Sequence, residues 1–160
     1  MIIVKIALMA CLLWVFKQDI KERLVFWWLF PMIAILFSVL FLNQVVKEIY
    51  LQYVLMNLAL VSVILLLLFA YSGFVLKSGF INTSFGLGDA LLFIALSFSF
   101  PTLAFCVLLS FSLVFSLVLH FVLVRKQELK TVPLAGYMSL FFAISMIFNE
   151  TGFFPNLYLM

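Results

Sequence analysis

Residues 90–124 read ALLFIALSFSFPTLAFCVLLSFSLVFSLVLHFVLV and contain no Asp, Glu, Lys or Arg. One helix of these 35 residues would be roughly 50 Å long, whereas the hydrocarbon core of a membrane is about 30 Å thick. Pro101 interrupts the stretch, and proline suits the first turn of a helix, because the N–H that it lacks is not needed there. We therefore predict two helices, residues 90–100 and 102–124, joined by a tight turn.

The remainder of the chain is also strongly apolar. Hydrophobic residues make up 68% of the 160 residues, and there are only nine Lys or Arg and six Asp or Glu. A globule of 18.4 kDa cannot bury so much apolar surface. The sequence therefore predicts an all-α polytopic membrane protein, a single integral-membrane domain over residues 1–160 with no soluble domain. Four more segments with little or no charge complete a predicted bundle of six transmembrane helices with short loops: residues 6–16, 24–42, 51–76 and 132–149.

Basic residues predict how these helices are oriented. Seven Lys and Arg residues lie in three loops, residues 17–23, the loop around Lys77 and residues 125–130, and short loops rich in Lys and Arg face the cytoplasm. Both termini then lie outside the inner (cytoplasmic) membrane. Because the net charge of +3 reflects these loops, the chain has no basic field of the kind that nucleic-acid binding requires. We expect no nucleic-acid partner.

Cysteine and histidine give no sign of a metal centre. Cys11 and Cys106 both fall in apolar segments, where a thiol usually packs as a small hydrophobic group. The single histidine, His120, is interpreted as an interfacial or hydrogen-bonded residue. These residues form no metal-binding or disulfide pattern, so the sequence predicts neither a metal nor a cofactor.

Two carboxylates are predicted at the cytoplasmic ends of helices. Asp89 ends the motif Gly86-Leu87-Gly88-Asp89, directly before residues 90–100, and Asp19 follows the first helix. The two intervening helices cross the membrane out and back, so both acids face the cytoplasm, and an ionisable group in this setting is functional by default. Two nearby carboxylates share one proton, so that one can activate water while the other donates to a peptide carbonyl. This pattern favours an aspartyl protease, with Gly86 and Gly88 allowing close backbone approach.

Plainer interpretations of the same acids remain open. Asp89 could serve only as the N-cap of the following helix, and Asp19 could be a solvated charge at a loop end. Glu22 is the competing acid on the same side, and it could instead pair with a nearby Lys or Arg. The other acids fit less well, because Glu128 lies in a charged cluster and Glu48 and Glu150 are assigned to the opposite side.

In the order and spacing of these residues the chain resembles the peptidase region of the type IV prepilin peptidases, including archaeal preflagellin peptidases, within the Gly-x-Gly-Asp membrane aspartyl proteases. The likeness depends on Asp19 with Arg23 following, on the Gly86 to Asp89 motif, and on Val132-Pro133-Leu134 before the last helix. It implies that Asp19 and Asp89 form the catalytic pair, with Arg23 as a supporting residue. It also implies an endopeptidase that removes short basic leaders from pilin-like precursors, whose hydrophobic N-terminal helix would lie beside the enzyme in membrane lipid.

The chain departs from the family pattern at several positions. Leu91 stands where a lysine is usual, the Ile-Pro after the first motif is absent, and the glycine and proline expected after Pro133 are shifted or replaced in Leu134-Ala135-Gly136-Tyr137. The paired cysteines of many bacterial members are missing, so N-methylation of the product is not predicted. The alternative function is a non-catalytic membrane assembly or scaffold protein. A small transporter is less favoured, because transporters usually place ionisable groups near the bilayer midplane.

Overall fold

The computed structural model describes residues 1–22, 24–71, 86–123 and 132–150, without the side chain of Glu150. Within these ranges the chain is all helical and has no strand. The helices are α1 (Ile2–Glu22), α2 (Leu29–Leu42), α3 (Lys47–Tyr71), α4 (Leu87–Leu96), α5 (Thr102–Leu123) and α6 (Leu134–Glu150). The all-α prediction and the number of helices are confirmed. Only α3 and α5 are, by length and composition, long and apolar enough to cross a membrane, so the prediction of six spans is not settled by the helix lengths.

The break at Pro101 is confirmed. Helix α4 ends at Leu96, the chain turns through residues 97–100, and α5 begins at Thr102. The carbonyl of Pro101 accepts the first hydrogen bond of α5 from the amide of Phe105, at 2.8 Å. Proline therefore occupies the position where its missing N–H costs nothing.

The prediction of a loop at residues 17–23 is wrong for residues 17–22, which form the last turns of α1. This segment contains no Pro or Gly, and its Lys, Gln and Glu residues favour helix once a helix has begun. Asp19 therefore lies on a rigid helix instead of a loop. The start of the fourth helix also differs, because α4 begins at Leu87 and places Asp89 in its first turn.

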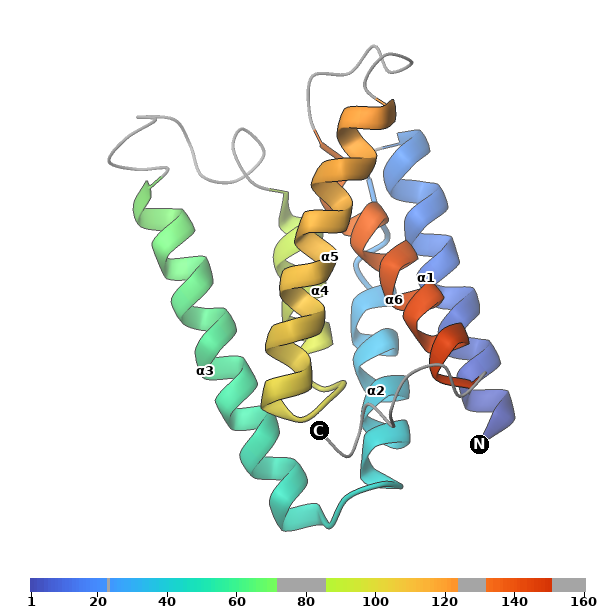
Figure 1. The fold of residues 1–160 in the computed structure, drawn as a ribbon, viewed down its shortest axis with the longest axis vertical. Coiled ribbons are helices and arrows are strands. Elements are labelled where there is room, and N and C mark those ends of the chain that lie inside the picture. Colours follow the sequence, from blue (N-terminus) through green and yellow to red (C-terminus); the bar gives the residue numbers. More distant parts are fainter. Residues whose placement is uncertain (23, 72–85, 124–131, 151–160) are drawn as a thin grey trace.

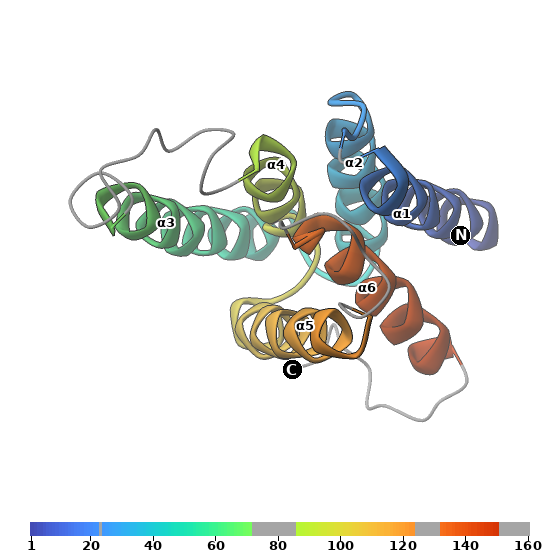
Figure 2. The ribbon, with the colours of Figure 1, turned by 90° about the horizontal axis from the view of Figure 1, so that it is seen from above.

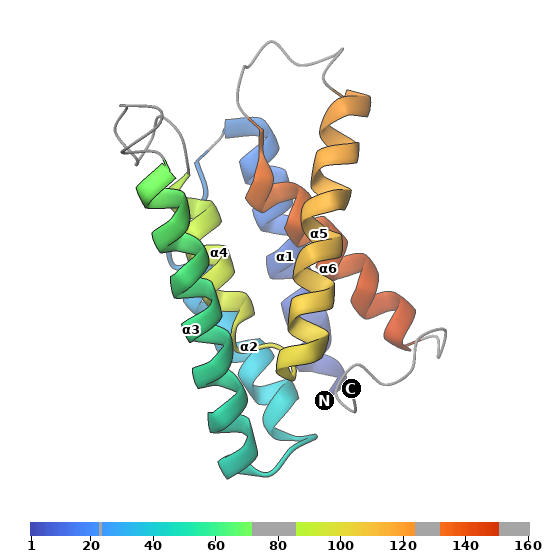
Figure 3. The ribbon, with the colours of Figure 1, turned by 60° about the vertical axis from the view of Figure 1, so that its left-hand side comes forward.

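The helices alternate in direction, so the end of α1 and the starts of α4 and α6 meet at one end of the bundle (Figure 1). Helix α6 packs against α1, α4 and α5, and Figure 3 shows it passing behind α5 on a diagonal. Helix α3 lies at the edge of the bundle, seen most clearly from above in Figure 2. The arrangement brings the start of α6 close to both segments that carry the predicted acids.

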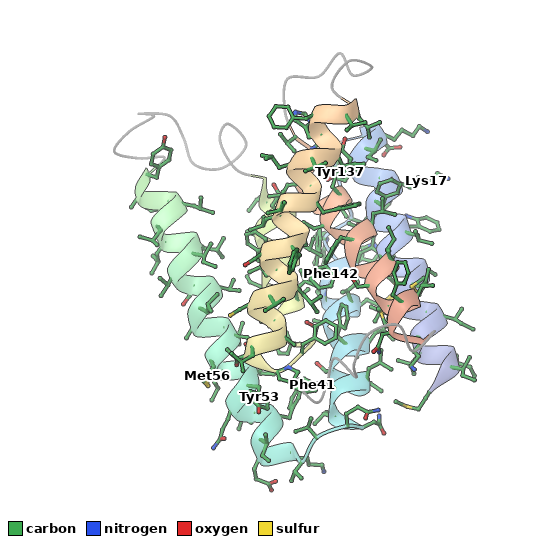
Figure 4. All side chains as sticks on the ribbon, viewed as in Figure 1. Lys17, Phe41, Tyr53, Met56, Tyr137 and Phe142 are labelled. Carbon is green, nitrogen blue, oxygen red and sulfur yellow. The ribbon has the colours of Figure 1, made fainter. Side chains whose placement is uncertain are left out.

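Three aromatic rings join the middle of the bundle. Phe37 of α2 packs edge-on against Phe100 of the 97–100 turn and against Phe142 of α6, with ring centroids 5.8 and 6.5 Å apart. The rings of Phe100 and Phe142 stack at 6.4 Å, and Phe142 lies in the centre of the view in Figure 4. All three side chains are buried. Their contacts fix the 97–100 turn, and with it the end of α4, against α2 and α6.

Asn57 of α3 satisfies the backbone of this buried turn. Its Nδ2 donates hydrogen bonds to the carbonyl oxygens of Ser97, at 3.1 Å, and Phe100, at 2.9 Å. The end of a helix leaves carbonyl groups without intrahelical partners, and burial makes such groups costly unless another donor reaches them. A single side chain thus connects the peripheral helix α3 to the turn between α4 and α5.

Replacing Asn57 with Leu is expected to lower the free energy of unfolding by about 1–3 kcal/mol, because two buried carbonyl groups lose their side-chain donor. Unfolding of the purified protein in detergent, followed by circular dichroism, measures the change. Gln52→Leu is the matched control, since Gln52 is exposed on the same helix. Equal stability of the two variants would contradict the role given to Asn57.

Candidate active site

The candidate site is built around the first turn of α6. Pro133 precedes the helix and has no N–H, the amide of Leu134 donates to the carbonyl of Val132 at 2.9 Å, and the amide of Tyr137 donates to the carbonyl of Pro133 at 3.1 Å. Two N–H groups remain in this turn, those of Ala135 and Gly136, and neither has a carbonyl one turn earlier in the helix to bind. The turn is buried, so these two groups need partners from elsewhere in the chain.

Both partners are the predicted acids. The amide of Ala135 donates to Asp89 Oδ1 at 2.7 Å, and the amide of Gly136 donates to Asp19 Oδ2 at 2.6 Å. Amide nitrogens of consecutive residues are about 3 Å apart in a helix, so the two carboxylate oxygens are at most about 8 Å from each other. The structure therefore brings the carboxylates of α1 and α4 together at one helix end.

The two acids differ in burial. Asp19 is only 8% exposed, although it lies in the last turns of α1, and Asp89 is half-buried. The N–H groups at a helix start carry partial positive charge, which favours carboxylates placed there. The start of α6 thus supplies the electrostatic compensation that two neighbouring acids need.

Asp89 does not act as the N-cap of its own helix. The N-cap of α4 is Gly86, so no side chain caps the helix from that position. The amide of Asp89 donates to the Gly86 carbonyl at 3.1 Å. The Asp89 side chain turns instead to α6. Capping of α4 therefore does not account for this carboxylate.

Two glycines leave room for the carboxylates. A Cβ atom at Gly136 would lie 3.0 Å from Asp19 Oδ2 and 3.1 Å from Asp19 Cβ, and a Cβ atom at Gly86 would lie 2.9 Å from Asp89 Oδ2. Among the described residues, a Cβ atom at Gly88 would meet only the ring of Phe30, at an ordinary 3.6 Å. Of the two glycines predicted in the motif, Gly86 is therefore the one in close contact with an acid.

Sequence reasoning missed Ala135 and Gly136 as site residues. In the sequence, Gly136 is part of a departure from the family pattern; in the structure, its missing side chain allows α1 to approach α6 at Asp19. A signal was present, because glycine inside a helix costs about 1 kcal/mol relative to alanine and therefore points to a packing requirement. No sequence signal distinguishes the backbone N–H of Ala135 as a donor.

The remaining candidates lie away from this pair or outside the described residues. Glu22 is exposed at the end of α1, and His120 is half-buried near the end of α5, with no hydrogen-bond partner for its buried Nδ1 within the part of the chain that the structure describes. No group of three His, Cys, Asp or Glu side chains among the described residues could hold a metal ion. Six charged residues named in the sequence analysis lie outside the described residues: Arg23, Lys77, Arg125, Lys126, Glu128 and Lys130.

Comparisons of the chain with protein-family models, with curated proteins and with solved structures give no match. The candidate site consists of two carboxylates from distant segments, two backbone N–H groups that hold them, and two glycines that make room for them.

Gly136→Ala is expected to lower the free energy of unfolding by about 1 kcal/mol or more, because the added methyl group pushes Asp19 away from α6. The intrinsic preference of alanine for helix acts in the opposite direction. Gly88→Ala is the matched control, since the same change there meets an ordinary contact, and its stability should equal or exceed that of the wild type. Unfolding in detergent compares the three proteins, and a Gly136→Ala protein as stable as Gly88→Ala would contradict this packing account.

Proposed function

We propose that the chain is a membrane-embedded aspartyl endopeptidase of the prepilin peptidase type, with Asp19 and Asp89 as its catalytic pair. The observation that carries the proposal is the binding of both carboxylates by consecutive amides at the start of α6. Two acids far apart in sequence meet there, one buried and one half-buried, and proximity of this kind is what shared proton chemistry requires. The resemblance in motif order and spacing points to the same reaction.

The proposed reaction uses one proton held by the pair. Asp89 Oδ1 and Asp19 Oδ2 accept hydrogen bonds from α6, and in the proposed reaction the two carboxylates act together on the substrate and water. The ionised carboxylate takes a proton from water as the water oxygen bonds to the peptide carbonyl carbon, and the protonated carboxylate donates to the carbonyl oxygen. The tetrahedral diol then breaks its C–N bond. The amine leaves with the proton taken from water, and the diol returns a proton to the other acid.

A membrane location is part of this proposal. Helices α3 and α5 are long and apolar enough to cross a bilayer, and large apolar side chains are exposed on all six helices. Such surface is rare on a soluble monomer and is suited to lipid. In the proposed topology all six helices lie within the inner membrane with both termini outside. The acids then face the cytoplasm, and α4, only 10 residues long, would cross about half of the hydrocarbon core.

The proposed substrate is a pilin-like precursor with a short basic leader before a hydrophobic helix. What supports this class is the motif resemblance together with the placement of the acids at a helix end, where a peptide bond next to a membrane-embedded helix could reach them. Leu91, in place of the usual lysine, and the chain's other departures concern substrate choice more than the pair itself. The proposed reaction uses no metal or cofactor and methylates no product.

The alternative is a non-catalytic membrane assembly or scaffold protein. One observation favours it, because both carboxylates already serve a structural purpose as partners of the α6 amides. Replacing each aspartate with asparagine distinguishes the catalytic role of the carboxylates from their structural role. The asparagine side-chain carbonyl can still accept from a backbone N–H, but an amide cannot exchange the proton that the reaction needs. The position of both acids at helix ends also disfavours a transporter, whose ionisable groups usually lie near the midplane.

Asp19→Asn and Asp89→Asn are each expected to reduce cleavage of a co-expressed pilin-like precursor by about 10²-fold or more, while both proteins remain folded, because asparagine keeps the α6 hydrogen bond but loses proton transfer. Loss of the leader, followed by the precursor's change in mass, measures the reaction. Glu22→Gln is the matched control, since Glu22 is an exposed acid one turn beyond Asp19. If both Asn variants process the precursor at the wild-type rate, the protein is not this peptidase.

Gly86→Ala should slow cleavage by about ten-fold, because a methyl group 2.9 Å from Asp89 Oδ2 displaces the carboxylate from its position. Gly88→Ala carries the same substitution two residues later, where space is available, and should retain nearly the full rate. Initial rates at saturating precursor compare the two variants. Equal rates, whether both fast or both slow, would contradict the assignment of Gly86 as the glycine that positions Asp89.

A further inference from the structure

An apolar groove lies on the outer side of the bundle between α1 and α2. It has a volume of about 160 Å³ and is lined by Ala10, Cys11, Trp14, Trp28, Leu29 and Met32. The two tryptophans are only partly covered, since Trp14 is 58% and Trp28 is 49% exposed. The groove is separate from the candidate active site, because Asp19 is buried on the side of α1 that meets α6.

Two lysines extend this groove toward the end of α1. Lys17 and Lys21 follow Trp14 by three and seven residues, so all three side chains share one side of the helix. Both lysines are exposed, and Figure 4 shows Lys17 pointing away from the bundle. At 1.5 Å per residue they lie about 5–10 Å closer to the end of α1 than Trp14 does. An apolar surface therefore continues directly into a positively charged one.

The size of the groove limits the kind of molecule that it can bind. An engineered apolar cavity of about 150 Å³ in another protein holds one benzene molecule, so this groove admits a slim hydrocarbon segment. A helix, with side chains, is about 10–12 Å across and does not fit. An acyl chain has the required thickness, and its phosphate-bearing end would lie where the lysines are.

We propose that the groove between α1 and α2 binds one anionic phospholipid of the cytoplasmic leaflet. Its acyl chain would lie along Ala10, Trp14 and Met32, and its headgroup would bind Lys17 and Lys21. Basic residues next to membrane helices attract anionic headgroups, and tryptophan favours the depth at which headgroup and acyl chain meet. Exposed Trp27, Phe26 and Leu24 adjoin Trp28 and add to this interfacial surface. The proposal depends on the membrane location proposed above but not on peptidase activity.

The test uses tryptophan fluorescence in lipid vesicles, because bromine on an acyl chain quenches a nearby indole. A Trp27→Phe protein keeps Trp14 and Trp28, the two indoles of the groove. It is reconstituted in phosphatidylcholine vesicles that contain a small fraction of either brominated phosphatidylglycerol or brominated phosphatidylcholine. The quenching should show that phosphatidylglycerol binds about five-fold or more tightly than phosphatidylcholine. Each lysine near the membrane surface strengthens the binding of an anionic lipid by about that factor.

Substitutions then locate the site. In the Trp27→Phe background, Lys17→Gln with Lys21→Gln should abolish the preference for phosphatidylglycerol, whereas Lys47→Gln, an exposed lysine at the start of α3, should leave it intact. Ala10→Phe fills the groove and should reduce quenching by both brominated lipids. A pilin-like precursor should not displace the lipid.

Several results would overturn the proposal. Equal quenching by the two brominated lipids, or a preference that survives loss of both lysines, means that only ordinary surrounding lipid is present. Unchanged quenching in Ala10→Phe would mean that no acyl chain lies in the groove. Displacement of the lipid by the precursor would mean that the groove binds the substrate instead. Quenching by neither lipid would contradict both the proposed membrane location and the proposed lipid site. Precursor cleavage by the same variants is scored separately, so a failed peptidase proposal and a failed lipid site give different results.

Discussion

The start of α6 presents backbone N–H groups that the helix itself cannot satisfy, and the fold buries this turn among other helices. The chain meets the requirement with the carboxylates of Asp19 and Asp89. Each acid, in turn, needs compensation for being placed beside another acid, and the partial positive charge of the helix start provides it. The α6 amides and the two carboxylates therefore stabilise each other. Their hydrogen bonds fix the end of α1 and the beginning of α4 relative to α6.

Several local features follow from that constraint. Pro133 reduces the number of N–H groups that need partners, and Gly136 and Gly86 provide the space in which the carboxylates lie. At the far end of α4 the chain must turn back inside the bundle, where Asn57 donates hydrogen bonds to two buried carbonyl groups of the turn. The aromatic cluster of α2, α6 and the 97–100 turn then fixes α4 against the helix whose start holds Asp89. Both ends of this short helix are thus held by polar contacts, half-buried at its start and buried at its end.

The sequence allows much of the fold to be predicted, because apolar segments and a well-placed proline determine where helices begin and end. It was correct about the number of helices and the break at Pro101, and it was wrong about residues 17–22 because apolar periodicity does not show whether a charged segment continues a helix. The two acids could be proposed from the sequence because charges are rare in this chain. Ala135 and Gly136 could not be proposed as site residues from the sequence. Every residue except proline has a backbone N–H, and only the packed structure shows which N–H groups lack a partner within their own helix. The catalytic role of the pair stays a prediction.

A double-mutant cycle on the unfolding free energy tests most directly whether Asp19 and Asp89 act as one unit at the start of α6. Asp19→Asn, Asp89→Asn and the double variant are unfolded in the same detergent at neutral pH. Residues that share a site are coupled by about 0.5–3 kcal/mol, and the account predicts a coupling energy in that range. Strictly additive effects, within about 0.3 kcal/mol, would mean that the two carboxylates are independent and would contradict the account.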